Sequence, residues 1–135
     1  MSDVVIVAEN GQGRYQQTVE IGQHRLIADE PVNVGGNDAG PAPFDFLMAG
    51  LGACTSMTSR MYAERKGLSL TGISVALRHS TIDVDGRSRD QISRDITLSG
   101  ELSDEARQRL LEIANKCPVH RALTQSVMIE SRLLE

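Results

Sequence analysis

The segment 44–66 constrains the fold of this chain more than any other, because it is long, apolar and rich in small residues. Its larger side chains recur at spacings of three and four, the period of one helix face. That stripe consists of Phe44, Leu47, Leu51, Cys54, Thr58 and Met61. A second stripe, of small residues, consists of Ala49, Gly52, Ala53 and Ser56. Because each glycine costs a helix about 1 kcal/mol, we expect another element to approach this helix closely, and the helix to be central and nearly all buried.

The segments before this helix predict three strands and a loop. The strands are expected at 4–9, 15–21 and 23–29, and Gly22-Gln23 is a tight hairpin connection between the last two. Residues 30–43 contain several glycines and prolines, which is typical of a loop.

The segments after the helix, which Gly67 ends, alternate between strand and helix signals. Residues 73–80 and 92–98 alternate apolar and polar side chains as strands do, and 81–90 predict a loop or a hairpin end. Ser103 is expected to cap a second helix, which Pro118 must break or kink. Residues 127–134 predict a closing strand. The order βββ-α-ββ-α-β indicates an α+β fold in a single domain, residues 1–135.

Charge and hydropathy exclude several classes of function. The net charge is −4, and the chain lacks the clusters of Lys and Arg that bind phosphates, so we expect no nucleic-acid partner. No apolar run reaches the roughly 18 residues of a membrane span, and the first residues do not have the pattern of a signal peptide. We therefore expect a cytoplasmic protein, in which a cycling disulfide is more in keeping than a permanent one.

The chain has two cysteines, Cys54 and Cys117. If the fold brings them together, they form a reducible thiol pair in an apolar setting, suited to redox chemistry on an apolar substrate. Free cysteine has a pKa of about 8.5, so a cation or hydrogen-bond donors must lower that of a buried Cys54. If a short helix starts at Pro118, Cys117 is its N-cap and the helix amides favour a thiolate there. Inert, buried cysteines are the structural alternative.

Other polar residues have structural as well as functional interpretations. Four residues could in principle bind zinc: Cys54, Cys117, His79 and His120. Their spacing lacks the paired ligands of a CxxC motif, so we expect no metal, and we expect no cofactor. Asp45 is placed to cap the long helix. Arg14 and Arg25 are expected to be solvated unless the fold turns one of them inward.

Two segments together resemble the OsmC/Ohr family, the osmotically inducible and organic hydroperoxide resistance proteins. They are GGNDAGPAPFDFLMAGLGACTSMTSRMYAERKG, at 35–67, and KCPVHRAL, at 116–123. The resemblance covers nearly the whole chain and its order of elements. The segment GPAPFD resembles the corresponding segment of a less characterised branch of the family. It implies an intertwined homodimer, in which two central helices pack back to back inside sheets from both chains.

The resemblance also implies a reaction. In the family, the first cysteine attacks a hydroperoxide and becomes a sulfenic acid, and the second condenses with it to a disulfide. By motif match, Cys54 is the peroxidatic residue and Cys117 the resolving one. A dithiol, in some members a lipoylated protein, then reduces the disulfide.

One part of the family pattern differs in this sequence. Better-known members place a glutamate ten residues before the first cysteine, where it pairs with an arginine over the thiolate. Phe44 stands at that position here, so Asp45 beside it is the candidate for the acidic role. Arg14 is the first candidate for the arginine and Arg25 the second.

The chain is therefore interpreted as a cytoplasmic, thiol-dependent reductase of organic hydroperoxides, with its site at a dimer interface. The expected lining is apolar and favours alkyl or lipid hydroperoxides over hydrogen peroxide; it comprises Phe44, Leu47, Met48 and Leu51. Two alternatives stay open. The same cavity could bind an apolar ligand that the cysteines only line, or the protein could be a detoxifying or stress protein that acts on another electrophile.

Overall fold

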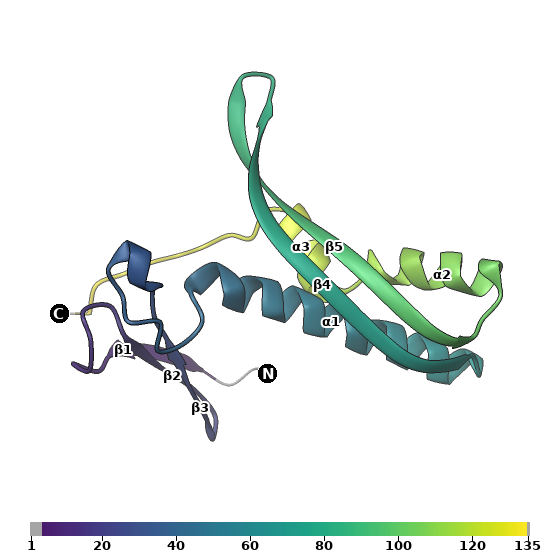
Figure 1. Ribbon diagram of the computed structural model, residues 1–135, viewed down its shortest axis with the longest axis horizontal. Coiled ribbons are helices and arrows are strands. Elements are labelled where there is room, and N and C mark those ends of the chain that lie inside the picture. The colour runs from purple at the N-terminus through teal and green to yellow at the C-terminus, as the bar shows by residue number, and fades with distance from the viewer. Residues whose placement is uncertain (1–3, 135) are drawn as a thin grey trace. The chain divides into compact units, whose positions relative to one another are not determined.

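The computed structural model describes residues 4–134, as three strands, a long helix, a two-stranded hairpin and two shorter helices (Figure 1). The α+β class predicted from the sequence is confirmed. The chain forms two compact units, one up to Leu47 and one from Met48 onward, and each is described by itself. The prediction of a single domain stays a prediction.

The N-terminal unit contains an antiparallel sheet in the order β1-β2-β3. Its strands are β1 (Val5–Glu9), β2 (Gln17–Ile21) and β3 (His24–Ala28), which confirms the three predicted strands. Gly22 has a positive φ of 57° in the tight turn between β2 and β3, a conformation that glycine adopts without steric cost. A short 3-10 helix, η1 (Val32–Val34), interrupts the predicted loop.

One buried carboxylate organises the loop that follows β3. Asp29 is only 3% exposed, and it accepts backbone N–H groups from Glu30 at 2.8 Å, Asn37 at 3.2 Å and Ala39 at 3.1 Å. The Ala39 amide lowers the pKa of Asp29 most, and the other two amides add to it against the opposing effect of burial. Gly36 fits here because a Cβ would collide with the carbonyl of Glu30.

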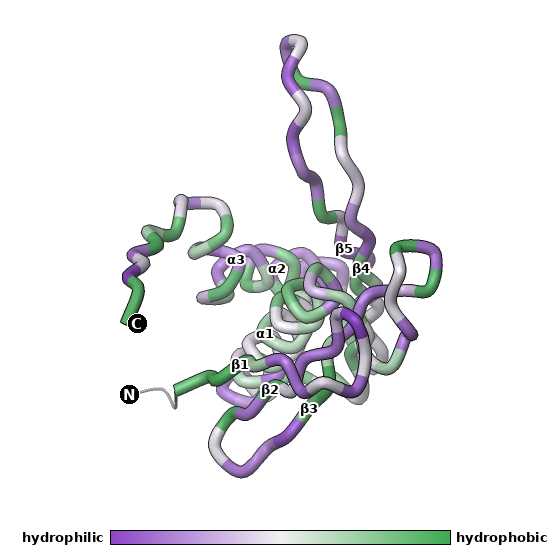
Figure 2. The backbone as a smooth tube through the Cα atoms, turned by 90° about the vertical axis from the view of Figure 1, so that its left-hand side faces the viewer, coloured by the Kyte–Doolittle hydropathy of each residue, from purple (hydrophilic) through white to green (hydrophobic). Residues whose placement is uncertain are grey.

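The C-terminal unit contains a long antiparallel hairpin of β4 (Ser69–Val84) and β5 (Arg87–Glu101). Of the two predictions for 81–90, the hairpin end is confirmed and the loop is wrong, because the strands continue to the turn at Asp85-Gly86. Both turn residues have positive φ, 53° and 79°, as a two-residue type I′ hairpin requires. Figures 1 and 2 show the hairpin tip projecting away from the helices.

Helix α1 (Pro43–Lys66) buries one face only, so the expectation of a nearly wholly buried helix is wrong for the single chain. The buried residues are Leu51, Gly52, Thr55, Ser59 and Ala63. Thr55 and Ser59 can be buried because their hydroxyls donate to helix carbonyls one turn earlier, at 2.7 and 2.9 Å. The predicted close approach occurs at Gly52, where a Cβ would lie 2.8 Å from the Leu77 side chain of β4.

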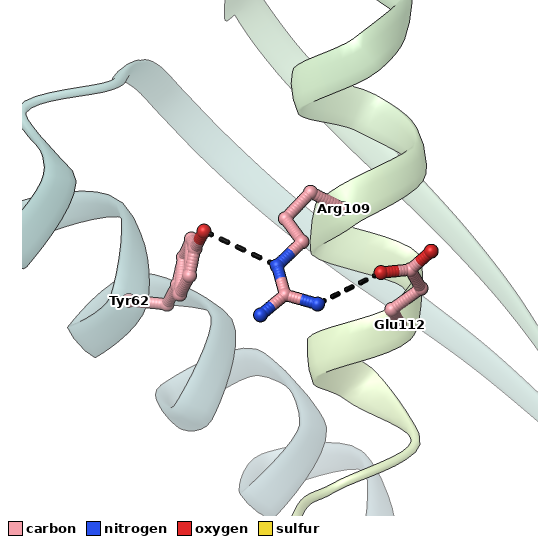
Figure 3. A network of polar contacts seen from close by, with 3 residues as sticks. All are labelled: Tyr62, Arg109 and Glu112. Carbon is pink, nitrogen blue, oxygen red and sulfur yellow. Dashed lines mark hydrogen bonds and ion pairs between the residues drawn. The ribbon is translucent and has the colours of Figure 1, made fainter.

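Two shorter helices follow the hairpin, α2 (Asp104–Ala114) and α3 (Pro118–Thr124). Ser103 caps α2 by accepting the Ala106 amide at 3.0 Å, as predicted. The Arg109 guanidinium of α2 donates to the Tyr62 hydroxyl of α1 at 3.4 Å and to Glu112 at 2.8 Å (Figure 3). These contacts join α2 to α1 at the exposed rim of a small core of Ala63, Leu70 and Leu110. Among residues 4–134, no helix has both the length and the apolar character needed to cross a bilayer.

The strand predicted at 127–134 is wrong for this chain. The segment follows α3 without secondary structure, and within the described residues it belongs to neither sheet. A strand needs a hydrogen-bonding partner, and this segment has none in those sheets. Its apolar side chains are consequently open to solvent: Met128 is 96% exposed and Leu133 is 94% exposed.

Replacing Asp29 by Asn should destabilise the protein, because the amide turns a nitrogen donor toward backbone N–H groups that need acceptors. We expect the melting temperature of Asp29→Asn to fall by several degrees. The matched control is Asp38→Asn in the same loop, where the side chain is exposed and φ is 55°. Asparagine tolerates this left-handed backbone, so that variant should melt close to wild type.

The stabilisation by Asp29 should also depend on pH in one direction. The pKa of the folded carboxylate is lowered, whereas that of an unfolded aspartate is about 3.9. The contribution is therefore complete above about pH 4 and is lost as the pH falls through the folded-state pKa. Thermal melts of wild type and Asp29→Asn over the acidic range measure it, and a difference that does not change with pH would contradict this origin.

Candidate active site

Cys117 lies at the junction between α2 and α3. It is fully buried and has extended backbone angles, φ −64° and ψ 142°, as the N-cap of α3. Its sulfur accepts the His120 amide at 3.3 Å, and Pro118 occupies the first helical position, where its missing N–H costs nothing. The predicted short helix with Cys117 as its cap is confirmed.

Cys54 lies on α1 and is half-buried. The Val119 amide, in the first turn of α3, and the Cys117 thiol lie near enough to the Cys54 sulfur to lower its pKa. The Thr58 hydroxyl lies one helical turn further along α1, 4.0 Å from the same sulfur. The fold therefore brings the two cysteines of the chain close together within the C-terminal unit.

The pKa values of the two thiols are shifted in opposite directions. Burial by itself raises the pKa of Cys54, but donation from Val119, Cys117 and Thr58, together with the charge of Arg94, outweighs burial and lowers it. Burial raises the pKa of Cys117, and the neighbouring Cys54 raises it further against the hydrogen bond from the His120 amide. The expected thiolate at Cys117 is therefore wrong: its cap hydrogen bond does not compensate for complete burial.

Arg94 of β5 is a cation at this site that the sequence analysis did not single out. Its guanidinium donates to the Thr55 hydroxyl at 2.8 Å, to the Ala114 carbonyl at 3.2 Å, to the Asn115 side chain at 2.9 Å and to His120 Nδ1 at 3.0 Å. The sequence did contain a signal for Arg94 as a site residue. It lies on the inward face of an alternating strand, between isoleucines two residues away on either side.

The predicted acid and arginines belong to the N-terminal unit. Asp45 accepts the Ala42 amide at 3.0 Å and so caps the first turn of α1, the structural role expected for it. The Arg14 guanidinium lies over the Tyr15 ring, 4.9 Å from its centre. Arg25 is exposed on β3. Their roles at the thiols stay predictions.

The predicted lining residues are divided between the two units. Phe44 and Leu47 belong to the N-terminal unit and are 42% and 39% exposed. Met48 and Leu51 belong to the C-terminal unit, where Met48 is half-buried and Leu51 is buried.

The histidines considered for zinc have other partners. His79 pairs with Asp90 at 2.8 Å on the exposed hairpin, and His120 uses Nδ1 to accept from Arg94. Burial and the positive charge of Arg94 both lower the pKa of His120. Within residues 4–134, no three His, Cys, Asp or Glu side chains gather as metal ligands would.

Comparisons with known proteins agree on the family. Residues 35–132 match the family model described as OsmC-like protein. Solved structures with the same fold include an OsmC like protein from Mycoplasma pneumoniae, at 20% identity and a TM-score of 0.76, covering 94% of this chain and 89% of that one. An organic hydroperoxide resistance protein OsmC from Legionella pneumophila has 22% identity and a TM-score of 0.67, covering 89% and 88%.

The organic hydroperoxide resistance protein OhrB of Bacillus subtilis has 19% identity and a TM-score of 0.65, and the match covers 90% of each chain. No curated protein sequence matches this chain. At these identities the structural matches establish the fold, and the family model covers well over half of the sequence. This chain belongs to the family of OsmC-like proteins.

Proposed function

We propose that this protein is a cysteine-dependent reductase of organic hydroperoxides. The observation that carries the proposal is the proximity of two thiols of unequal acidity, Cys54 with a lowered pKa and Cys117 with a raised one. A thiolate is the nucleophile that attacks peroxides, and a neighbouring neutral thiol can resolve the product. The names of the Legionella and Bacillus proteins, which share the fold, support the same chemistry.

The reaction then proceeds in three balanced steps. The Cys54 thiolate attacks the outer oxygen of the hydroperoxide, the O–O bond breaks, and the alkoxide takes a proton from solvent and leaves as the alcohol. Cys54 is now a sulfenic acid. The Cys117 sulfur attacks it as the Cys117 thiol loses its proton, water leaves, and a Cys54–Cys117 disulfide forms. An external dithiol, such as a lipoylated protein, reduces this disulfide and becomes oxidised itself.

The surroundings of Cys54 favour an apolar substrate. Met48 lies on α1 in the two turns before Cys54 and is half-buried, so it offers apolar surface on that approach, whereas Leu51 is buried in the single chain and stays a predicted lining residue. Phe44 and Leu47 are proposed to extend it, by resemblance to the family. Asp45 and Arg14, with Arg25 as the second choice, are proposed on the same basis to act at the thiolate.

We also propose that the working form is a homodimer in the cytoplasm. The face of α1 opposite its buried side carries Gly50, Ala53, Met57 and Met61, all exposed in the single chain. Met57 is 60% exposed and Met61 is 65% exposed, and methionine adapts well to a packing partner. The described chain has a thin core, whose largest fully buried side chains are Leu110, Thr55, Cys117 and Ser59. A second copy on this face would complete the burial.

The cysteine roles are tested by single-turnover reactions with cumene hydroperoxide. Wild type should lose both thiols rapidly and form an intramolecular disulfide. Cys54→Ser should react no faster than a free thiol, because Cys117 is buried and protonated. Cys117→Ser should consume one equivalent and accumulate a sulfenic acid that dimedone traps, as mass spectrometry would show.

A comparison of substrates separates the proposed function from its alternatives. Cumene hydroperoxide should react faster with wild type than hydrogen peroxide does, because its apolar group gains from the apolar approach. Slow loss of thiols with both peroxides would refute the reductase and favour a protein that binds an apolar ligand or reacts with another electrophile.

The rate of the first step should follow the thiolate of Cys54. The rate should rise about tenfold per pH unit below the lowered pKa of Cys54 and level off above it. The midpoint should lie below the value of about 8.5 for free cysteine. Thr58→Val removes one stabilising contact and should raise the midpoint. Thr97→Val, on an exposed position of β5, is the control, and a midpoint at or above that of free cysteine in wild type would contradict the assignment.

The dimer is tested by placing a charge on the exposed face of α1. Met57→Glu should convert the dimer into single chains, because the carboxylate would be desolvated in the interface. Light scattering after gel filtration measures the mass. Leu111→Glu on α2, where the leucine is 47% exposed, is the matched control and should remain dimeric. A wild-type protein that runs as a single chain would refute the proposed assembly.

A further inference from the structure

The segment that carries Cys117 is tied to its surroundings through Arg94. This segment runs from the end of α2 at Ala114 to His120 in the first turn of α3. The Arg94 guanidinium donates to the Ala114 carbonyl, to the Asn115 side chain and to His120 Nδ1. Three acceptors therefore flank Cys117 on both sides, and all are held by a side chain from β5.

The same guanidinium also reaches the helix that carries the other thiol. Its Nη1 donates at 2.8 Å to the hydroxyl of Thr55, the residue that follows Cys54 on α1. Thr55 is fully buried, and its hydroxyl donates to the Leu51 carbonyl at 2.7 Å, which fixes its orientation. Arg94 thus links the residue that follows Cys54 to residues on both sides of Cys117.

The arrangement uses the shape of arginine rather than its charge alone. The planar guanidinium presents five N–H donors in fixed directions, whereas the lysine ammonium is a compact charge on a flexible stem. Arg94 is bonded to the neighbours of the sulfurs. Among the causes that lower the pKa of Cys54, its charge is the smallest of those that act.

We propose that Arg94 is a positioning residue that holds the Cys117 sulfur within attacking distance of Cys54. The inference rests on the proposed function, because it concerns the second step of that reaction. In this step the Cys117 sulfur displaces a leaving group from the Cys54 sulfur, water from a sulfenic acid or a thiolate from a mixed disulfide. Correct placement of a reacting group is worth large rate factors, and a displacement of about 1 Å can cost on the order of a hundredfold.

A nitrobenzoate disulfide, the chromogenic thiol reagent, separates the two steps without peroxide. The Cys54 thiolate attacks the reagent and releases one coloured thiolate, leaving a mixed disulfide on Cys54. The Cys117 sulfur then attacks Cys54, loses its proton and releases a second coloured thiolate as the protein disulfide forms. The first phase depends on reagent concentration and reports the acidity of Cys54. The second phase is independent of that concentration and reports the placement of Cys117.

Arg94→Lys is the decisive variant, because it keeps the positive charge and loses the fixed N–H donors of the planar guanidinium. We expect its first phase to stay within about twofold of wild type and its second phase to slow by tenfold to a hundredfold. Asn115→Ala removes one of the four contacts at an exposed position and should slow the second phase by a smaller factor. It also keeps the test available if Arg94→Lys folds poorly. Arg78→Gln, in the same hairpin and 71% exposed, is the control and should leave both phases unchanged.

The outcomes distinguish this inference from the proposed function. Equal second phases in Arg94→Lys, Asn115→Ala and wild type would overturn the positioning role. A slower first phase in Arg94→Lys with an unchanged second phase would also overturn it, in favour of a role in activating Cys54. If wild type fails to reduce cumene hydroperoxide but its second phase still depends on Arg94, the proposed function fails and the positioning role stands.

Discussion

The proximity of the two cysteines depends on how three helices meet around the guanidinium group of Arg94. Arg94 bonds to Thr55, 39 residues away in the sequence, and to His120, 26 residues away, so a side chain from the hairpin connects α1 to α3. It also binds the Ala114 carbonyl at the C-terminal end of α2, where a cation is favoured by the helix dipole. A single residue therefore satisfies a helix end and fixes the spacing of the thiols.

The difference in pKa between Cys54 and Cys117 depends on which amide N–H groups in the first turn of α3 act on each sulfur. The His120 amide donates to the Cys117 sulfur as the helix cap, whereas the Val119 amide lowers the pKa of Cys54. Cys117 is buried completely and keeps its proton, and Cys54 is half-buried and receives several donors. The same helix terminus thus makes one thiol acidic and leaves the other neutral, which is the asymmetry that a nucleophile and its resolving partner need.

Local signals in the sequence predicted much of this fold, and the failures have physical causes. A cysteine before a proline correctly indicated that Cys117 caps a helix starting at Pro118, because both signals act within one turn. The sequence predicted that both stripes of α1 would be buried, whereas the single chain buries one face, which includes Thr55 and Ser59 from neither stripe. Hydropathy counts the hydroxyls of Thr55 and Ser59 as polar, although both are satisfied by their own helix. Arg94 was missed as a site residue because its four partners come together only in the folded chain.

The remaining failures concern apolar surface that the single chain leaves exposed. The pattern at 127–134 has the composition of a strand, yet a strand also needs an edge to pair with, and composition cannot say which chain supplies that edge. Exposed apolar surface also occurs on β1, which is largely hydrophobic in Figure 2 and exposed along its whole length. Met57 and Met61 on α1 are exposed as well. Apolar periodicity reports that a face will be buried, not what buries it. The sequence indicates more buried apolar surface than the single chain buries. This is the pattern expected if selection acts on an assembly rather than on one chain.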